Sequence, residues 1–147
     1  ELLYIYTHFM GCGVGELPKR EVIGQTLQSA QPEVLAFCEE LIQQMEAETQ
    51  VRFTEDANLF YSLLLHINSM ITRIQYNVRI VCLLREKTVA EFPQMYAQVK
   101  SAVLELKKKY YPKHFISEDA LCYLCLYFQL ALEPKTPRRR VLLVCST

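Results

Sequence analysis

The residues best suited to chemistry are a histidine and an arginine, His66 and Arg73, in the apolar stretch DANLFYSLLLHINSMITR (56–73). Successive residues of a helix are rotated by about 100° around its axis, so the apolar side chains of this stretch would share one sector. His66 lies about 100° to one side of Ile67, which is in that sector. Arg73 lies about 120° to the same side. On this flank the base of the imidazole packs while its ring stays reachable, which suits a group that is modified or titrated. An arginine there can pair with an added negative charge.

The residues by themselves leave simpler interpretations open. A histidine on a helix is commonly a structural residue that packs and forms hydrogen bonds. A helical rise of 1.5 Å per residue places Arg73 about 10 Å along the axis from His66, so the two groups meet only if both side chains bend. Arg73 is therefore equally compatible with a solvated charge on the helix flank.

Composition limits the class of protein. The 147 residues are enough for one domain with a core, and sixteen basic residues balance sixteen acidic ones. Nothing in this charge balance favours binding to nucleic acid or to a membrane surface. No apolar run reaches 18 residues and no basic leader opens the chain, so we expect neither a membrane span nor a signal peptide. The six cysteines lie mostly in apolar helical patterns, which fits a reducing cytoplasm.

The periodicity predicts an all-α fold, a compact antiparallel bundle of about five helices over residues 32–133. Apolar residues recur at three- and four-residue spacing, and few glycines or prolines interrupt them. Prolines suit helix starts, and Ser or Thr followed by acidic residues suits helix N-caps. We expect one helix to begin at Pro32 and another at Pro93. A helix capped by Thr54 is expected to run to about Tyr76, and a weaker helix to cover about 82–91. Ser117 is the expected cap of the last helix.

Few features of the sequence indicate a metal site, a cofactor site or an enzyme active site. Cys122 and Cys125 form a lone CxxC, whereas a structural zinc site needs four ligands and no second pair is suitably spaced. Core packing explains this pair better. An enzyme that uses His66 with a cysteine or a carboxylate is an alternative, but no glycine-rich phosphate loop or nucleophile elbow appears. We therefore expect no metal, no cofactor and no enzyme activity.

Two motifs carry a resemblance to a known family. The segments LLLHINSMITR (63–73) and ISEDALCYLCLYF (116–128) resemble the two histidine-bearing helices of the phosphotransferase-system (PTS) regulation domain, or PRD, of bacterial transcriptional regulators and antiterminators. The resemblance spans about 32–133. It implies that His66 is a phosphate acceptor and that Arg73 pairs with the phosphate. The family's second histidine is replaced by Tyr127, and a phenol with a pKa near 10 is a poor substitute in phosphoryl transfer.

The flanking residues extend the resemblance. The segment YIYTHF (4–9) is similar to YLCLYF (123–128), so residues 1–10 are expected to be the C-terminal remnant of a preceding PRD, with His8 as its second histidine. The end of the chain, RRRVLLVCST, resembles the start of a PTS IIB domain, with its first strand in 141–147 and Cys145 as a phosphate acceptor. Residues 11–31 and 134–140 are the expected linkers.

The family resemblance also implies a function. Phosphotransferase proteins, HPr or a sugar-specific IIB, would phosphorylate the domain on histidine according to sugar supply. The added charge would change the packing of a homodimer, and a nucleic-acid-binding domain outside these residues would read out the change in a sugar operon. The loss of the second histidine at Tyr127 supports an alternative, a degenerate domain that serves only as a helical dimerisation spacer.

Overall fold

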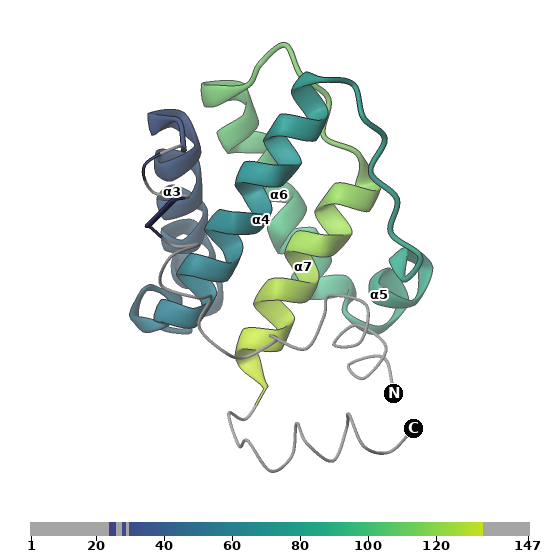
Figure 1. The fold of residues 1–147 in the computed structure, drawn as a ribbon. Helices are drawn as coiled ribbons and strands as arrows, with labels where there is room; N and C mark the ends of the chain where they lie inside the picture. Colours follow the sequence, from purple (N-terminus) through teal and green to yellow (C-terminus); the bar gives the residue numbers. More distant parts are fainter. Residues whose placement is uncertain (1–23, 26–27, 29, 134–147) are drawn as a thin grey trace, which may run out of the picture.

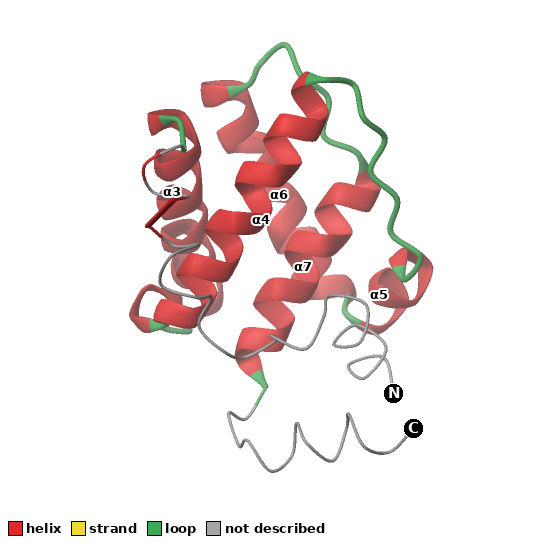
Figure 2. Ribbon diagram, viewed as in Figure 1, coloured by secondary structure: helices red, strands yellow, loops and turns green. Residues whose placement is uncertain are grey.

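The computed structural model describes residues 24–25, 28 and 30–133 (Figure 1). Among these residues every regular element is a helix and none is a strand, which confirms the predicted all-α class (Figure 2). The elements, labelled as in Figure 1, are α3 (Pro32–Thr49), the 3-10 helix η1 (Phe53–Glu55), α4 (Ala57–Gln75), α5 (Arg85–Glu91), α6 (Pro93–Tyr110) and α7 (Glu118–Leu132).

Four long helices form the body of the bundle. Helix α3 packs against α4 and α6, and α7 packs against the same two helices. The short α5 packs against α7 and α6 at the side away from α3 (Figure 1). Chain direction alternates between packed neighbours, since α4 rises in the view of Figure 1 while α3 and α7 descend. The bundle thus presents α4 and α7 side by side, and these are the helices that carry the two sequence motifs.

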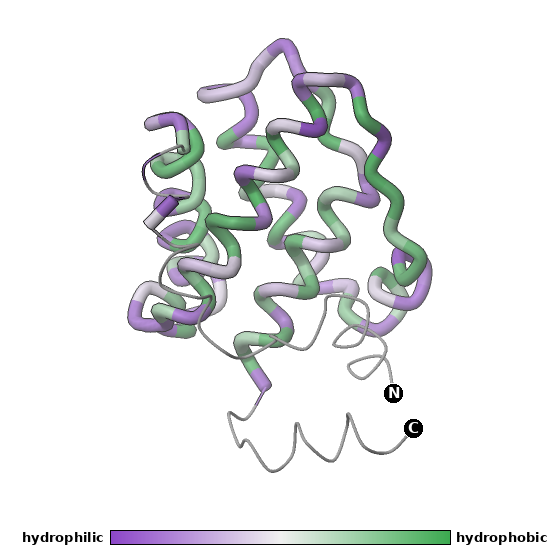
Figure 3. Tube along the Cα trace, in the orientation of Figure 1, coloured by the Kyte–Doolittle hydropathy of each residue, from purple (hydrophilic) through white to green (hydrophobic). Residues whose placement is uncertain are grey.

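The core lies between the four long helices and is filled by large apolar side chains. Hydrophobic positions recur along each of these helices between hydrophilic ones (Figure 3). Phe37 of α3 and Phe128 of α7 are fully buried. Phe53 of η1 meets Phe128 edge to face, with ring centroids 5.1 Å apart. The short η1 turn therefore contributes to the core as well as linking α3 to α4.

Three of the predicted helix starts are confirmed. Pro32 opens α3, where its missing N–H costs no hydrogen bond. Ser117 caps α7, and its side chain accepts a hydrogen bond from the Ala120 backbone N–H at 3.2 Å. Pro93 likewise opens α6.

The predicted cap of α4 was wrong. The cap is Asp56, whose carboxylate accepts from the Leu59 backbone N–H at 3.1 Å. Thr54 instead lies in η1, and its hydroxyl donates to the Glu46 carboxylate of α3 at 2.7 Å. The helix begins later than the sequence pattern indicated, because η1 takes up the residues that would have formed its first turn.

The connector between α4 and α5 is longer than expected. Helix α5 begins at Arg85, not at about residue 82, so residues 76–84 form no helix. Cys82 and Leu84 of this connector are buried in a small apolar cluster with Cys122 and Leu126 of α7. These contacts fix the connector to α7 through side chains.

The expected flanking parts lie outside the described residues. These are the remnant of a preceding PRD with His8, most of the linker 11–31, the linker 134–140, and the IIB-like start with Cys145. They stay predictions. Among the helices that are described, none is both long and apolar enough to cross a membrane.

Candidate functional site

The imidazole of His66 lies at the contact between α4 and α7. Its immediate neighbour Ile67 is fully buried in the core, which places His66 at the edge of the buried face of α4. Two tyrosine rings of α7 pack against it, with ring centroids 4.9 Å away for Tyr127 and 5.5 Å away for Tyr123. The side chain is half-buried, and its Nε2 is buried with no hydrogen-bond partner among the described residues. The ring is thus less reachable than its flank position predicted, because α7 covers that flank.

This environment sets the protonation state of the ring. Burial, and to a smaller extent the positive charge of Arg73, lowers the pKa of His66 from 6.5 to about 4. At neutral pH the ring is therefore uncharged. Neutral imidazole has one nitrogen with a free lone pair, which is the form that acts as a nucleophile.

Arg73 lies two turns after His66 on α4 and is exposed. It forms no ion pair with another described residue. Its charge nevertheless reaches His66, since it disfavours protonation of the ring. The predicted pairing of Arg73 with a phosphate stays a prediction.

Tyr127 occupies the position where the family resemblance places a second histidine. The bundle brings this position directly against His66. The Tyr127 side chain is half-buried, and burial raises the pKa of its phenol, with the nearby Tyr123 acting in the same direction. The phenol is therefore uncharged at neutral pH and packs on the imidazole.

Tyr123 was not singled out by the sequence. Besides packing on His66, its hydroxyl donates to the Val81 carbonyl in the α4–α5 connector at 2.8 Å. The available signal was the four-residue spacing of Tyr123 and Tyr127, which places both rings on one face of α7. The spacing alone does not show which helix packs against that face, so it could not indicate that the two rings would contact His66.

The other sequence candidates do not join this site. Cys122 and Cys125 are both buried in α7, as expected for core residues. No group of three or more metal-ligating side chains occurs in the described part of the chain. Three lysines, Lys107 to Lys109, lie in the last turn of α6, and Lys109 forms an ion pair with Glu40 of α3 at 2.8 Å, so this lysine joins two helices.

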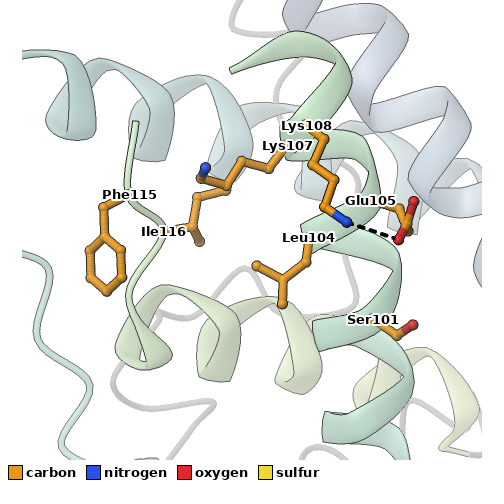
Figure 4. A pocket seen from close by; sticks show the side chains of 7 residues that line it. All are labelled: Ser101, Leu104, Glu105, Lys107, Lys108, Phe115 and Ile116. Atoms are coloured by element: carbon orange, nitrogen blue, oxygen red, sulfur yellow. Dashed lines mark hydrogen bonds and ion pairs between the residues drawn. The ribbon is translucent and has the colours of Figure 1, made fainter. Parts of the chain in front are cut away.

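A hollow of ≈ 390 Å³ lies elsewhere, between the C-terminal half of α6 and the loop that leads to α7 (Figure 4). Its rim carries the exposed ring of Phe115 and an ion pair between Lys108 and Glu105, 3.5 Å apart. The hollow shares no residue with the surroundings of His66. Its lining residues are Ser101, Leu104, Glu105, Lys107, Lys108, Phe115 and Ile116.

The described residues form an all-helical bundle with a half-buried, uncharged histidine between two of its helices. The protein-family model described as PRD domain matches residues 39–131, more than half of the chain. The chain belongs to the PRD family and is a regulatory domain. The matched region contains α4 and all but the last residue of α7, and it includes His66, Arg73 and Tyr127. Searches of curated proteins and of solved structures gave no match.

Proposed function

We propose that this PRD is a phosphorylation-controlled domain of a sugar-operon transcriptional regulator, with His66 as its phosphate acceptor. The observation that carries the proposal is the neutral imidazole of His66 at the α4–α7 contact, inside the region that matches the family. HPr or a sugar-specific IIB protein would be the phosphate donor. A nucleic-acid-binding domain outside these residues would give the output.

The chemical step is a phosphoryl transfer between two proteins. The unprotonated nitrogen of His66 attacks the phosphorus of the donor's phosphorylated side chain, forming a new P–N bond as the bond to the donor residue breaks. The donor side chain keeps the electron pair of the broken bond. Because Nε2 is buried beneath the tyrosine rings, attack by that nitrogen requires local displacement of Tyr123 or Tyr127.

The product would alter the α4–α7 contact. A phosphoryl group adds a charge of about −2 and three acceptor oxygens where two uncharged aromatic rings now pack. Such a group is costly to bury without a partner, so it either recruits Arg73 or moves α7 away from α4. One charge-assisted hydrogen bond contributes about 1.5–3 kcal/mol. That range corresponds to about a tenfold or larger change in an association constant, enough to switch a homodimer.

A second candidate function is a degenerate PRD that serves as a helical dimerisation spacer without phosphorylation. The replacement of the second histidine by Tyr127 favours it, as does the buried Nε2 of His66. The two functions differ in one measurable property, the ability of the domain to accept phosphate.

The test is phosphorylation of the purified chain with phosphoenolpyruvate, enzyme I and HPr, and with a IIB protein in a second series. Phosphate-affinity electrophoresis and peptide mass mapping locate the label. We expect label on His66, loss of that label in His66→Ala, and full labelling in His114→Ala, a variant in the loop before α7. An unlabelled chain with all donors would favour the spacer function. Full histidine labelling of His66→Ala would contradict the assignment.

Assembly is tested separately by sedimentation. We expect a homodimer at micromolar concentration and a change in its dissociation constant in His66→Asp, which introduces a negative charge at the α4–α7 contact. An exclusively monomeric chain, or a His66→Asp variant with the same dissociation constant as the native chain, would contradict control through dimer packing.

A further inference from the structure

Two cysteines meet beside the His66 site. The Sγ atoms of Cys82, in the α4–α5 connector, and Cys122, on α7, lie 2.8 Å apart. Forty positions separate the two residues in the chain, so only the folded bundle brings them together. The CxxC partner of Cys122, Cys125, lies one turn along the same helix. The sequence therefore pointed to a different cysteine pair from the one that the fold brings into contact.

We propose that Cys82 and Cys122 are a reversible redox pair, and that their disulfide fastens the α4–α5 connector to α7 and restricts access to His66. Two thiols at this separation need only a small approach of the sulfur atoms to reach the length of a covalent bond. Both sit in one apolar cluster with Leu84 and Leu126, which holds the connector and α7 together before oxidation.

The two thiols are unequal. The hydrogen-bonded contact between the two thiols lowers the pKa of Cys82, and the same contact, together with burial, raises the pKa of Cys122. Cys82 therefore loses its proton more readily than Cys122. Cys82 is also the more accessible of the two, being 6% exposed where Cys122 is 0% exposed.

The order of steps with a small-molecule disulfide as oxidant follows from this difference. The Cys82 thiolate attacks one sulfur of the oxidant, and a mixed disulfide between Cys82 and that half of the oxidant forms as the S–S bond of the oxidant breaks. The other half of the oxidant leaves as a thiolate and takes up a proton. Cys122 then loses its proton and attacks Cys82 Sγ, releasing the second half of the oxidant as a thiol. Overall, the two cysteines lose two hydrogens and two electrons, and one oxidant disulfide becomes two thiols. Excess reduced thiol reverses both steps.

The cysteine pair is connected to His66 through the chain neighbours of the two cysteines, Tyr123 and Val81. Tyr123 follows Cys122, packs on the imidazole, and donates to the carbonyl of Val81, the residue before Cys82. The connector and α7 are thus already joined at Val81 and Tyr123 by a hydrogen bond. A disulfide adds a covalent link one residue away, so movement of Tyr123 off the imidazole then requires deformation of a closed loop.

The first experiment measures the bond itself and involves no phosphoryl donor. The full chain carrying Cys12→Ser and Cys145→Ser is incubated folded with oxidised glutathione, and non-reducing peptide mass mapping identifies the products. We expect a Cys82–Cys122 disulfide, absent from Cys82→Ser and from Cys122→Ser, and retained in the matched control Cys125→Ser. Chains that stay fully reduced, that keep glutathione on Cys82, or that pair Cys122 with Cys125 would overturn the proposal.

The second experiment measures access to the ring with a chemical probe. Diethyl pyrocarbonate acylates neutral imidazole, and mass mapping gives separate rates for His66 and His114. We expect His66 to react several-fold more slowly in the oxidised chain than in the reduced chain, with an unchanged rate at His114 and recovery after reduction. Equal rates of His66 acylation in the oxidised and reduced chains would contradict the proposal that the disulfide restricts access to the ring. The readout does not depend on phosphorylation, so failure of the proposed phosphoacceptor role would leave it interpretable.

Discussion

The ring of Tyr127 on α7 lies 4.9 Å, centroid to centroid, from the imidazole of His66 on α4. In the two-histidine pattern that this chain resembles, these positions carry the two acceptors. The fold places these two positions in contact, and in this chain they hold one imidazole and one phenol. Four predictions follow from this arrangement and from the helices that hold it.

Replacement of Tyr127 by histidine is expected to restore a second acceptor. In the phosphorylation assay, Tyr127→His should take up more phosphate per chain than the native protein, and Tyr127→Phe should match the native level, since an apolar ring keeps the packing. Tyr123→His provides the matched control, because Tyr123 contacts the same imidazole from a position outside the family's histidine pattern. Equal labelling of Tyr127→His and the native chain would contradict the assignment of this position.

The low pKa of His66 is expected to make the fold less stable in mild acid. In the unfolded chain the ring takes up a proton near pH 6.5, whereas in the folded chain it stays neutral down to about pH 4. The unfolded state therefore binds more protons between these values, and the free energy of unfolding falls as the pH drops through this window. The shift corresponds to on the order of 3 kcal/mol. Above pH 6.5 this contribution is fully present.

Urea denaturation at pH 7 and at pH 5 measures this effect. His66→Phe keeps an aromatic ring of similar size and cannot titrate, so its loss of stability between the two pH values should be smaller than that of the native chain. An equal loss in both proteins would show that His66 is not the group responsible. Titration of the His66 ring resonances by NMR gives the folded pKa directly.

Asp56 is expected to anchor the start of the helix that carries His66. Asp56→Ala removes the acceptor of the Leu59 backbone N–H and should lower the free energy of unfolding by about 1 kcal/mol. Asp56→Asn should retain most of the stability, because an amide oxygen accepts the same bond. If Thr54→Val, which leaves the Asp56 carboxylate in place, reduced α4 helicity more than Asp56→Ala, the cap assignment would be wrong. Circular dichroism and urea denaturation supply both measurements.

Phe128 is expected to be among the most sensitive positions in the core. Its ring is 0% exposed and packs edge to face on Phe53, so Phe128→Ala should lower the free energy of unfolding by about 3–5 kcal/mol. Phe115 is the matched control, since its ring is 79% exposed and Phe115→Ala should change stability by less than about 0.5 kcal/mol. Similar losses in the two variants would contradict the described packing. Denaturant midpoints provide the comparison.

Local signals in the sequence accounted for most of the secondary structure. The 3.6-residue period and the residues Pro32, Pro93 and Ser117 located the helices, because periodicity and helix starts depend on neighbours within one or two turns. The misplaced cap at Thr54 has a tertiary origin. Its hydroxyl is used by Glu46 of α3, a contact that local pattern does not encode.

The sequence also pointed to His66 as the candidate acceptor and to Arg73 on the same flank, because both lie in one continuous motif on one helix. Both roles stay predictions. Only the tertiary structure decided what surrounds them. The pairing of α4 with α7 covers His66 with Tyr123 and Tyr127 and buries Nε2, and this desolvation keeps the ring neutral. The same docking brings distant thiols together. Burial, pKa and contacts between distant residues depend on which helix faces project toward each other, and that is set by packing of the whole bundle rather than by spacing within one segment.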